Sequence, residues 1–262
     1  MPYAANGNVN LYWDQEGSGD PVLLIMGLGY PSDMWFRTRP VLNRLYSTIA
    51  LDNRGVGKSD VPPGPYTVAE MADDAAAVVR AAGVGKVHAF GASLGGMIAQ
   101  EFALRHPDLV KSLILGCTTA GGPTATPADP GVLATLMARG SMTPEEGVRA
   151  MIPYIYDEST PRERIEEDMK VRLRTFPSPV GYFAQVQAAG AFDSYDRLAQ
   201  LDVKTLVIHG ENDLLIPPAN ARLLAQRIPG AKLVMLPNAS HIFMADQPEL
   251  SQQALLDFLG SV

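Results

Sequence analysis

Two hydrophobic patterns alternate along this 262-residue sequence, one typical of buried strands and the other of helices. Predominantly apolar runs bounded by glycine, proline or charged residues are typical of strands buried on both faces of a sheet. They occupy residues 21–27, 47–52, 86–90, 110–116, 204–210 and 231–237. Residues 2–5 and 9–17 flank Asn6-Gly7, a pair suited to the positive φ angles of a tight turn, and predict an N-terminal hairpin.

Helix start and stop signals mark the segments between these runs. Thr67 and Glu70 form a predicted capping box before apolar residues at helical spacing, and Gly83 ends that helix. The other predicted helices of this part are residues 94–106, 218–228 and 248–260. Buried strands that alternate with such helices predict an α/β fold, with a mostly parallel central sheet flanked by helices on both faces.

The alternation stops after Cys117. Residues 118–131 are rich in glycine, proline and threonine, and no buried-strand run follows before residue 199. Thr143-Pro144-Glu145-Glu146 and Thr160-Pro161-Arg162-Glu163 instead predict two helix starts, each capped by its threonine. The charged helix that the second one opens is interpreted as a solvated face. We therefore predict a core domain of residues 1–121 and 199–262, interrupted by a helical cap of residues 122–198.

Composition and charge narrow the classes of function. A net charge of −7 and a pI near 5.1 argue against nucleic-acid binding. One cysteine excludes an internal disulfide and offers no metal cluster, and no metal or organic cofactor is expected. The N-terminus lacks the features of a signal peptide, and no apolar stretch is long enough to span a bilayer. These features predict a cytoplasmic protein that is not membrane-bound; a homodimer is compatible with them.

Ser93 stands at the turn from a predicted strand into a predicted helix, within Gly91-Ala92-Ser93-Leu94-Gly95. One interpretation is a helix N-cap. The other is a nucleophile, because G-x-S-x-G between a strand and a helix holds the serine hydroxyl clear of the backbone on a sharp, strained turn. The first amides of the helix then point at whatever binds there. The strand and helix context favours the nucleophile.

A serine nucleophile needs a base and a carboxylate that orients the base. Of the four histidines, His88 lies inside a strand, His106 at a helix end where it is expected to cap carbonyls, and His209 at a strand end. His241 lies in a loop between the last strand and the last helix, and by elimination it is the predicted base. Glu211 and Asp213 are the candidate acids, and Asp213, deeper in its loop, is preferred. Ser93, Asp213 and His241 all follow strands, so they are expected at one edge of the sheet, where open α/β sheets bind ligands.

At these residues the chain resembles the α/β-hydrolases, over essentially its whole length. The matching segments, in the family's order, are "LLIMGLG" (23–29), "LDNRGVGKSD" (51–60), "GASLGG" (91–96), "GENDLLIPP" (210–218) and "SHIF" (240–243). The resemblance implies Ser93 as nucleophile, His241 as general base and Asp213 as its orienting carboxylate. It also implies an oxyanion hole formed by the main-chain N–H groups of Leu28 and Leu94.

Two further segments invite a structural interpretation. Many family members carry His-Gly where this chain has Met26-Gly27, which makes the expected pocket floor more apolar; a core position for Met26 is equally compatible. In residues 51–60, Arg54, Asp52 and Asp60 are expected to pair and brace their loop rather than contact substrate.

The predicted function is hydrolysis of a small apolar carboxylic ester through an acyl-enzyme on Ser93. Alternatives on the same residues are a lactonase or enol-lactonase, a carbon–carbon bond hydrolase and a cofactor-free perhydrolase; an alternative of another class is a non-catalytic ligand-binding protein with this fold. A serine nucleophile argues against haloalkane dehalogenases and epoxide hydrolases. The residues expected to line the substrate pocket are Met26, Leu28, Leu94, Ile216 and Ile242, with Met137, Met142, Phe183 or Phe192 from the cap.

Overall fold

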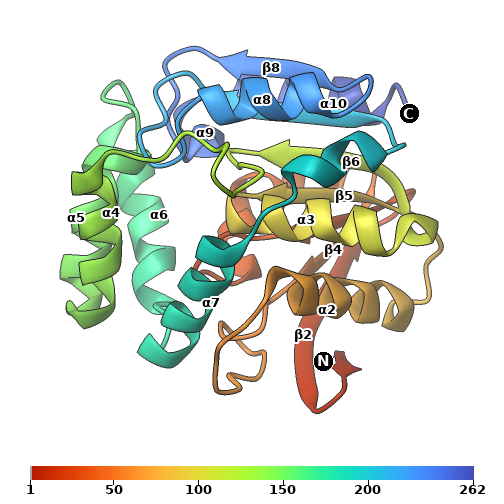
Figure 1. The fold of residues 1–262 in the computed structure, drawn as a ribbon, viewed down its shortest axis with the longest axis horizontal. Helices are drawn as coiled ribbons and strands as arrows, with labels where there is room; N and C mark the ends of the chain where they lie inside the picture. The colour runs from red at the N-terminus through yellow and green to blue at the C-terminus, as the bar shows by residue number, and fades with distance from the viewer. Residues whose placement is uncertain (1) are drawn as a thin grey trace.

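The structure, a computed structural model, describes residues 2–262; Met1, the first residue of the predicted core segment, lies outside them. The described residues form an eight-stranded sheet in the order β1-β2-β4-β3-β5-β6-β7-β8 (Figure 1). The strands are β1 Tyr3–Asn6, β2 Val9–Gly17, β3 Pro21–Ile25, β4 Ser47–Leu51, β5 Val87–Ala92, β6 Val110–Gly116, β7 Thr205–Gly210 and β8 Lys232–Leu236. Strands β3 to β8 pair in parallel, and β1 and β2 are antiparallel, which confirms the predicted fold class and the hairpin.

Helices pack on both faces of the sheet. They are α1 Arg39–Leu42, α2 Val68–Ala81, α3 Leu94–Arg105, α4 Pro130–Ala138, α5 Pro144–Ile155, α6 Arg162–Arg174, α7 Pro179–Ala191, α8 Ala219–Arg227, α9 Phe243–Asp246 and α10 Pro248–Leu259. Side chains of α2, α3 and α8 cover one face of the sheet, and those of α9 and α10 cover the other. Within β3, Leu23 and Ile25 point to the first face while Val22 and Leu24 point to the second. Burial on both faces explains the continuous apolar runs of the sequence.

Helices α4 to α7 are inserted between β6 and β7, and we call them the cap helices. Figure 1 shows α4, α5 and α6 standing together at one side of the sheet. Helix α5 begins with the predicted capping box, in which Thr143 and Glu146 bond each other's main-chain N–H groups. The cap is joined to the rest of the chain by ion pairs, including Arg37 with Asp168 and Arg174 with Asp33.

Two predictions about polar residues are wrong. Thr160 does not cap α6, which begins after Pro161; its hydroxyl instead donates to Asp246 at 2.6 Å. Within residues 2–262, His106 caps no carbonyl: its Nε2 lies 2.7 Å from Asp73, on α2. In both cases the side chain bonds a partner distant in sequence in place of a local group. The predicted solvated face of α6 is present, since most of its charged residues are exposed, but Asp168 and Arg172 of the same helix are buried.

The predicted bracing of residues 51–60 uses other partners than expected. Arg54 pairs with Asp74 on α2 at 2.6 Å, not with a carboxylate of its own loop. Asp52 accepts from the Ser32 and Lys58 main chain, and Asp60 accepts from Asn10. The three side chains therefore tie this loop to three neighbouring segments. No helix within residues 2–262 is both long and apolar enough to cross a bilayer.

Candidate active site

Ser93 connects β5 to α3 in a strained backbone conformation, with φ of 57° and ψ of −121°. Its own main chain is held at both ends: the N–H donates to the Gly116 carbonyl at 2.9 Å, and the carbonyl accepts from the Thr118 hydroxyl at 2.7 Å. Its side chain makes no capping hydrogen bond to α3, so the N-cap interpretation does not hold. Backbone strain that persists only under such constraint is typical of functional positions.

Two glycines make this turn sterically feasible. A Cβ on Gly91 would lie 2.0 Å from the Gly95 carbonyl oxygen, and a Cβ on Gly95 would lie 2.0 Å from that of Ile25. Both clashes involve main-chain atoms, which cannot move aside without disturbing β3 or α3. The G-x-S-x-G spacing therefore reflects close backbone packing around the serine.

Replacing Gly95 with alanine is expected to destabilise the fold by about 3 kcal/mol or more, because the new methyl group overlaps the Ile25 carbonyl. Urea unfolding would measure the loss. The matched control is Gly190→Ala in α7, where a Cβ meets nothing within 4 Å; it is expected to stabilise by about 0.5 kcal/mol or more through helix propensity. Equal shifts in both variants would contradict the steric explanation.

Asp213 and His241 lie together at the ends of β7 and β8. The His241 Nδ1 atom lies 2.8 Å from Asp213 Oδ2, and both side chains are buried. The other carboxylate oxygen of Asp213 accepts from the main-chain N–H groups of Leu215 at 2.9 Å and Ile216 at 2.8 Å. Burial opposes ionisation of Asp213, but His241 and His209 outweigh it and lower its pKa to about 2. Asp213 is therefore a carboxylate at neutral pH and orients the imidazole of His241.

His209 is a second histidine on the same carboxylate. Its Nε2 atom lies 3.2 Å from Asp213 Oδ2 and donates to the Ile216 carbonyl at 2.8 Å, and the side chain is fully buried. His209 thus holds the loop that carries Asp213 and is not itself positioned as a base. The sequence predicts His209 near this edge of the sheet but not its contact with Asp213, because no local pattern distinguishes a strand-end histidine that makes such a contact.

Asp246 holds the loop that carries His241. Its carboxylate accepts from the Ser240 main-chain N–H at 2.7 Å and from the Thr160 hydroxyl of the cap at 2.6 Å. The Ile242 N–H donates to the Ile155 carbonyl of α5 at 2.8 Å, so the cap helps to fix the same loop. Burial raises the pKa of Asp246 to about 6. Asp246 was not identified from the sequence, where one aspartate before a helix is unremarkable.

Replacing Asp246 with asparagine is expected to remove a pH-dependent loss of stability. A carboxyl whose pKa is raised in the fold stabilises it fully below its unfolded pKa, near 3.8, and that contribution is lost as the pH rises through about 6. The introduced amide can still accept from the Ser240 N–H and can donate to Thr160. From pH 4 to pH 7.5, the free energy of unfolding of Asp246→Asn is therefore expected to rise by about 2 kcal/mol relative to that of wild type. Urea unfolding of wild type and Asp246→Asn at both pH values measures this difference. Asp108→Asn, a change at an exposed aspartate, is the control. If the stabilities of wild type and Asp246→Asn changed equally with pH, the prediction would be contradicted.

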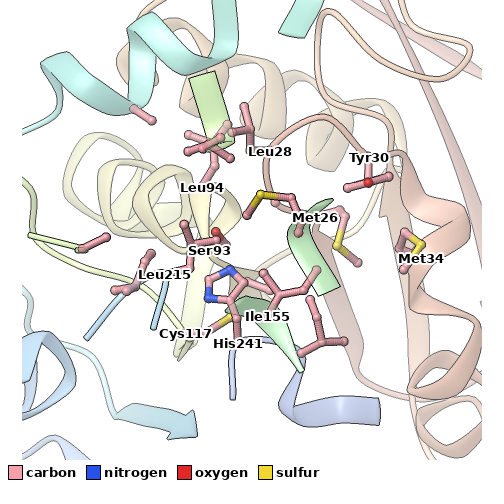
Figure 2. Close-up of a pocket in the computed structure, with 18 of the residues that line it drawn as sticks. Met26, Leu28, Tyr30, Met34, Ser93, Leu94, Cys117, Ile155, Leu215 and His241 are labelled. Atoms are coloured by element: carbon pink, nitrogen blue, oxygen red, sulfur yellow. The ribbon is translucent and has the colours of Figure 1, made fainter. Parts of the chain in front are cut away.

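Ser93 and His241 line a cavity of about 290 Å³, and Figure 2 shows the serine hydroxyl directed at the imidazole. Of the predicted pocket residues, those that line this cavity are Met26, Leu28, Leu94, Ile216 and Ile242. The main-chain N–H groups of Leu28 and Leu94 donate to no acceptor within residues 2–262. Two N–H groups without acceptors beside a serine hydroxyl are suited to stabilising a negatively charged oxygen.

The cap residues predicted for the pocket lie elsewhere, and this prediction is wrong. Met137 is half exposed, and Met142 follows the short helical turn Arg139–Ser141 without reaching the cavity. The Phe183 ring packs on Gly140, and Phe192 is buried in the core against the sheet. The cap instead contributes Leu133, Leu136, Met151 and Ile155 to the cavity. Which face of a cap helix meets the cavity depends on how the helices pack, and the apolar pattern alone does not determine it.

Gln185 is a further residue that the sequence did not reveal. This fully buried side chain of α7 accepts from the Gly29 N–H at 2.8 Å and donates to the Arg54 carbonyl at 2.8 Å. Gly29 follows Leu28 directly, so a cap residue holds the loop that presents the Leu28 N–H to the cavity.

Cys117 also lines the cavity, at the end of β6. Burial raises the pKa of its thiol well above the usual range, and the charge of Asp213 adds to the effect. A thiol that stays protonated is a weak nucleophile, so Ser93 remains the candidate nucleophile of this cavity.

Comparisons with known proteins agree with this arrangement. A model of the alpha/beta hydrolase fold matches residues 20–186 and 173–248. A protein of Azorhizobium caulinodans, named as a proposed carbamate hydrolase, RutD, is 33% identical over 267 residues, which span 100% of this chain and 99% of its own. A thermophilic esterase from Thermogutta terrifontis is 31% identical, with a TM-score of 0.84 over 98% of this chain and 96% of its own. An enol-lactonase from Burkholderia xenovorans LB400 is 27% identical, with a TM-score of 0.87 over 99% and 100%.

Proposed function

The chain belongs to the alpha/beta hydrolase family, and on that premise we propose that it hydrolyses small carboxylic esters through an acyl-enzyme on Ser93. The observation that carries the proposal is the arrangement of His241, which Asp213 orients at 2.8 Å and which faces the Ser93 hydroxyl in the cavity (Figure 2). In this proposal the three residues form a catalytic triad, and the Leu28 and Leu94 N–H groups form the oxyanion hole.

The proposed reaction has two halves. The Ser93 oxygen attacks the ester carbonyl carbon while its proton passes to the free ring nitrogen of His241, and the carbonyl oxygen becomes an oxyanion. The Leu28 and Leu94 N–H groups stabilise that charge. The carbon–oxygen bond to the alcohol then breaks, and His241 protonates the departing alkoxide. Water then attacks the acyl carbon while giving a proton to His241. The bond from that carbon to the Ser93 oxygen breaks, and His241 returns the proton to this oxygen, so the carboxylic acid leaves and the Ser93 hydroxyl is restored.

Asp213 supports both halves without changing its own protonation. Its carboxylate fixes the imidazole with Nδ1 protonated, which leaves the other ring nitrogen free to accept the serine proton. The positive charge that then forms on the ring lies next to a group whose pKa of about 2 keeps it ionised. The lining of the cavity is mostly apolar, and its low local dielectric constant strengthens the interaction between these charges.

A second candidate substrate is a lactone. It presents the same carbonyl and the same alkoxide leaving group, and the structural similarity to an enol-lactonase over nearly the whole chain favours it. The carbamate hydrolase name of a relative points to a third acyl substrate of this kind. We favour this proposal over a purely ligand-binding role, because the serine, the histidine with its carboxylate and two N–H groups without acceptors lie together at one cavity.

We also propose that residues 122–198 act as a cap over a core of residues 1–121 and 199–262. The insertion of α4 to α7 between β6 and β7, and their lining of the cavity, support this division. The cytoplasmic location expected from the sequence stays a prediction.

The experiment that tests the proposed function is hydrolysis of p-nitrophenyl esters of rising acyl length, together with a set of lactones, by wild type and Ser93→Ala. Turnover by wild type that the substitution abolishes would support a serine hydrolase, and the preferred acyl length would report the depth of the cavity. Ligand binding without turnover of any ester or lactone would refute it.

A further inference from the structure

Two buried arginines of the cap line the cavity that holds Ser93. Arg139 lies in the helical turn Arg139–Ser141 and is 4% exposed; Arg172 lies in α6 and is 5% exposed. Both guanidinium groups stack on the ring of Tyr30, at 4.8 Å and 4.4 Å from its centroid. In Figure 2, Tyr30 lies to one side of Ser93 and His241, and the stacking of both arginines on its ring assigns them to that side of the cavity.

Neither arginine forms a direct ion pair among the described residues, and the charge of Asp168 acts on Arg172 only over a longer distance. Within residues 2–262, no carboxylate lies within 4.0 Å of either guanidinium, and the Nε atom of each is buried without a hydrogen-bond partner. Arg139 donates to the Tyr30 hydroxyl. Asp168, the buried carboxylate nearby, is already engaged: its two oxygens accept from Arg37 at 3.0 Å and from the Tyr156 hydroxyl at 2.9 Å.

The surrounding tyrosines do not compensate the charge. Burial raises the pKa of Tyr156 and of Tyr182, so both phenols are neutral at physiological pH. Arginine does not lose its proton in proteins, so the two guanidinium groups remain cationic. A buried cation without a direct ion pair is unfavourable, and two such arginines persist side by side in a fold most readily where an anion binds between them.

We propose that Arg139 and Arg172 bind a carboxylate of the substrate, which is therefore an ester or lactone that carries a carboxylate on an apolar chain. This inference rests on the proposed hydrolysis at Ser93. The planar guanidinium fork matches a carboxylate geometrically, and stacking on Tyr30 holds the fork in place. Leu136, Met151 and Ile155 contribute apolar wall to the same cavity, which suits an apolar spacer between the carboxylate and the scissile bond.

The first test compares acidic esters with neutral ones of the same shape. Monomethyl and dimethyl esters of succinate, adipate and suberate carry the acid on the acyl side, and 4-acetoxybutanoate with its methyl ester carries it on the alcohol side. Wild type is expected to prefer an acidic member by about 10- to 100-fold in kcat/KM, as for hydrogen bonds to a charged group. Equal or better hydrolysis of the neutral partner in every pair would overturn the inference while leaving the proposed function intact.

Substitutions separate a binding role from a structural one. Arg172→Met and Arg139→Met are expected to reduce kcat/KM for the acidic ester at least tenfold more than for its neutral partner. Arg172→Met is expected to keep or raise Tm, because an apolar side chain replaces an unpaired buried cation. Arg172→Lys should recover part of the acid preference. Arg162→Met, exposed on the same helix, is the control and should alter neither substrate. A lower Tm with equal losses on both esters would mean a structural role and overturn the inference.

A binding measurement makes the inference independent of turnover. Calorimetric titration with adipate is expected to show binding to wild type and to Ser93→Ala, and at least tenfold weaker binding to Arg172→Met. If no ester or lactone is turned over but adipate binds through Arg172, the proposed function fails and the anion subsite stands. If adipate binds equally to wild type and Arg172→Met, or to neither, the subsite is refuted.

Discussion

Ser93→Ala is expected to lower kcat for ester hydrolysis by a factor on the order of 10⁶, because loss of the proposed nucleophile would remove the proposed acyl-enzyme route entirely. Residual hydrolysis would come from the Leu28 and Leu94 N–H groups and from binding alone. The fold should be unaffected, since the Ser93 side chain caps no helix N–H and alanine retains its Cβ. Steady-state kinetics on the preferred p-nitrophenyl ester, with Tm measured alongside, provide the test.

The control for this prediction concerns the other nucleophilic side chain of the cavity. Cys117→Ala should retain turnover, because burial keeps that thiol protonated. Labelling with a fluorophosphonate should add one adduct to wild type and to Cys117→Ala and none to Ser93→Ala, as read by mass spectrometry. Turnover that survives in Ser93→Ala and disappears in Cys117→Ala would reverse the assignment.

Asp213→Asn is expected to lower kcat by about 10⁴, the effect measured for the corresponding change in a serine protease triad. The amide offers only one oxygen, and the Leu215 and Ile216 N–H groups compete for it. Its NH₂ group then faces His241 and favours the ring tautomer that cannot take the serine proton. The imidazolium formed during reaction also loses its neighbouring negative charge. Kinetics from pH 5 to pH 9 measure the loss.

Glu211→Gln is the matched control for Asp213→Asn, since Glu211 lies two residues earlier in the same loop and is exposed. It is expected to retain wild-type kcat. Comparable losses in both variants would mean that the loop as a whole, and not the Asp213 carboxylate, is responsible.

Asp213 also makes a pH-dependent contribution to stability. A carboxyl whose pKa is depressed to about 2 stabilises the fold above its unfolded pKa, near 3.8, and that stabilisation is lost as the pH falls toward 2. Its contribution is therefore complete at neutral pH, where the proposed reaction takes place. The contribution of Asp246 to stability instead falls as the pH rises from 4 to 6. The two carboxylates near His241 therefore affect stability in opposite senses and over different pH ranges.

Much of the fold follows from short-range pattern. Apolar runs such as residues 21–27 predict strands because β3 is covered on both faces, and Thr67 with Glu70 predicts the start of α2 because a capping box involves residues only three positions apart. The edge of the sheet at which the candidate site lies follows from the same kind of pattern. Ser93, Asp213 and His241 each come after a strand, and in a parallel sheet those ends meet at one edge, where the structure has them.

What the sequence by itself determined was thus the order of strands and helices and the edge at which the candidate reactive residues gather, since both depend on neighbours within a few positions. Only the tertiary structure decided which distant side chains meet: His209 with Asp213, Thr160 with Asp246, and Gln185 with the loop after β3. The packing of the cap likewise turned Arg172 inward and left Met137 outside. Such contacts join segments tens of residues apart, and they are selected by shape and charge in the assembled fold, which no local periodicity encodes.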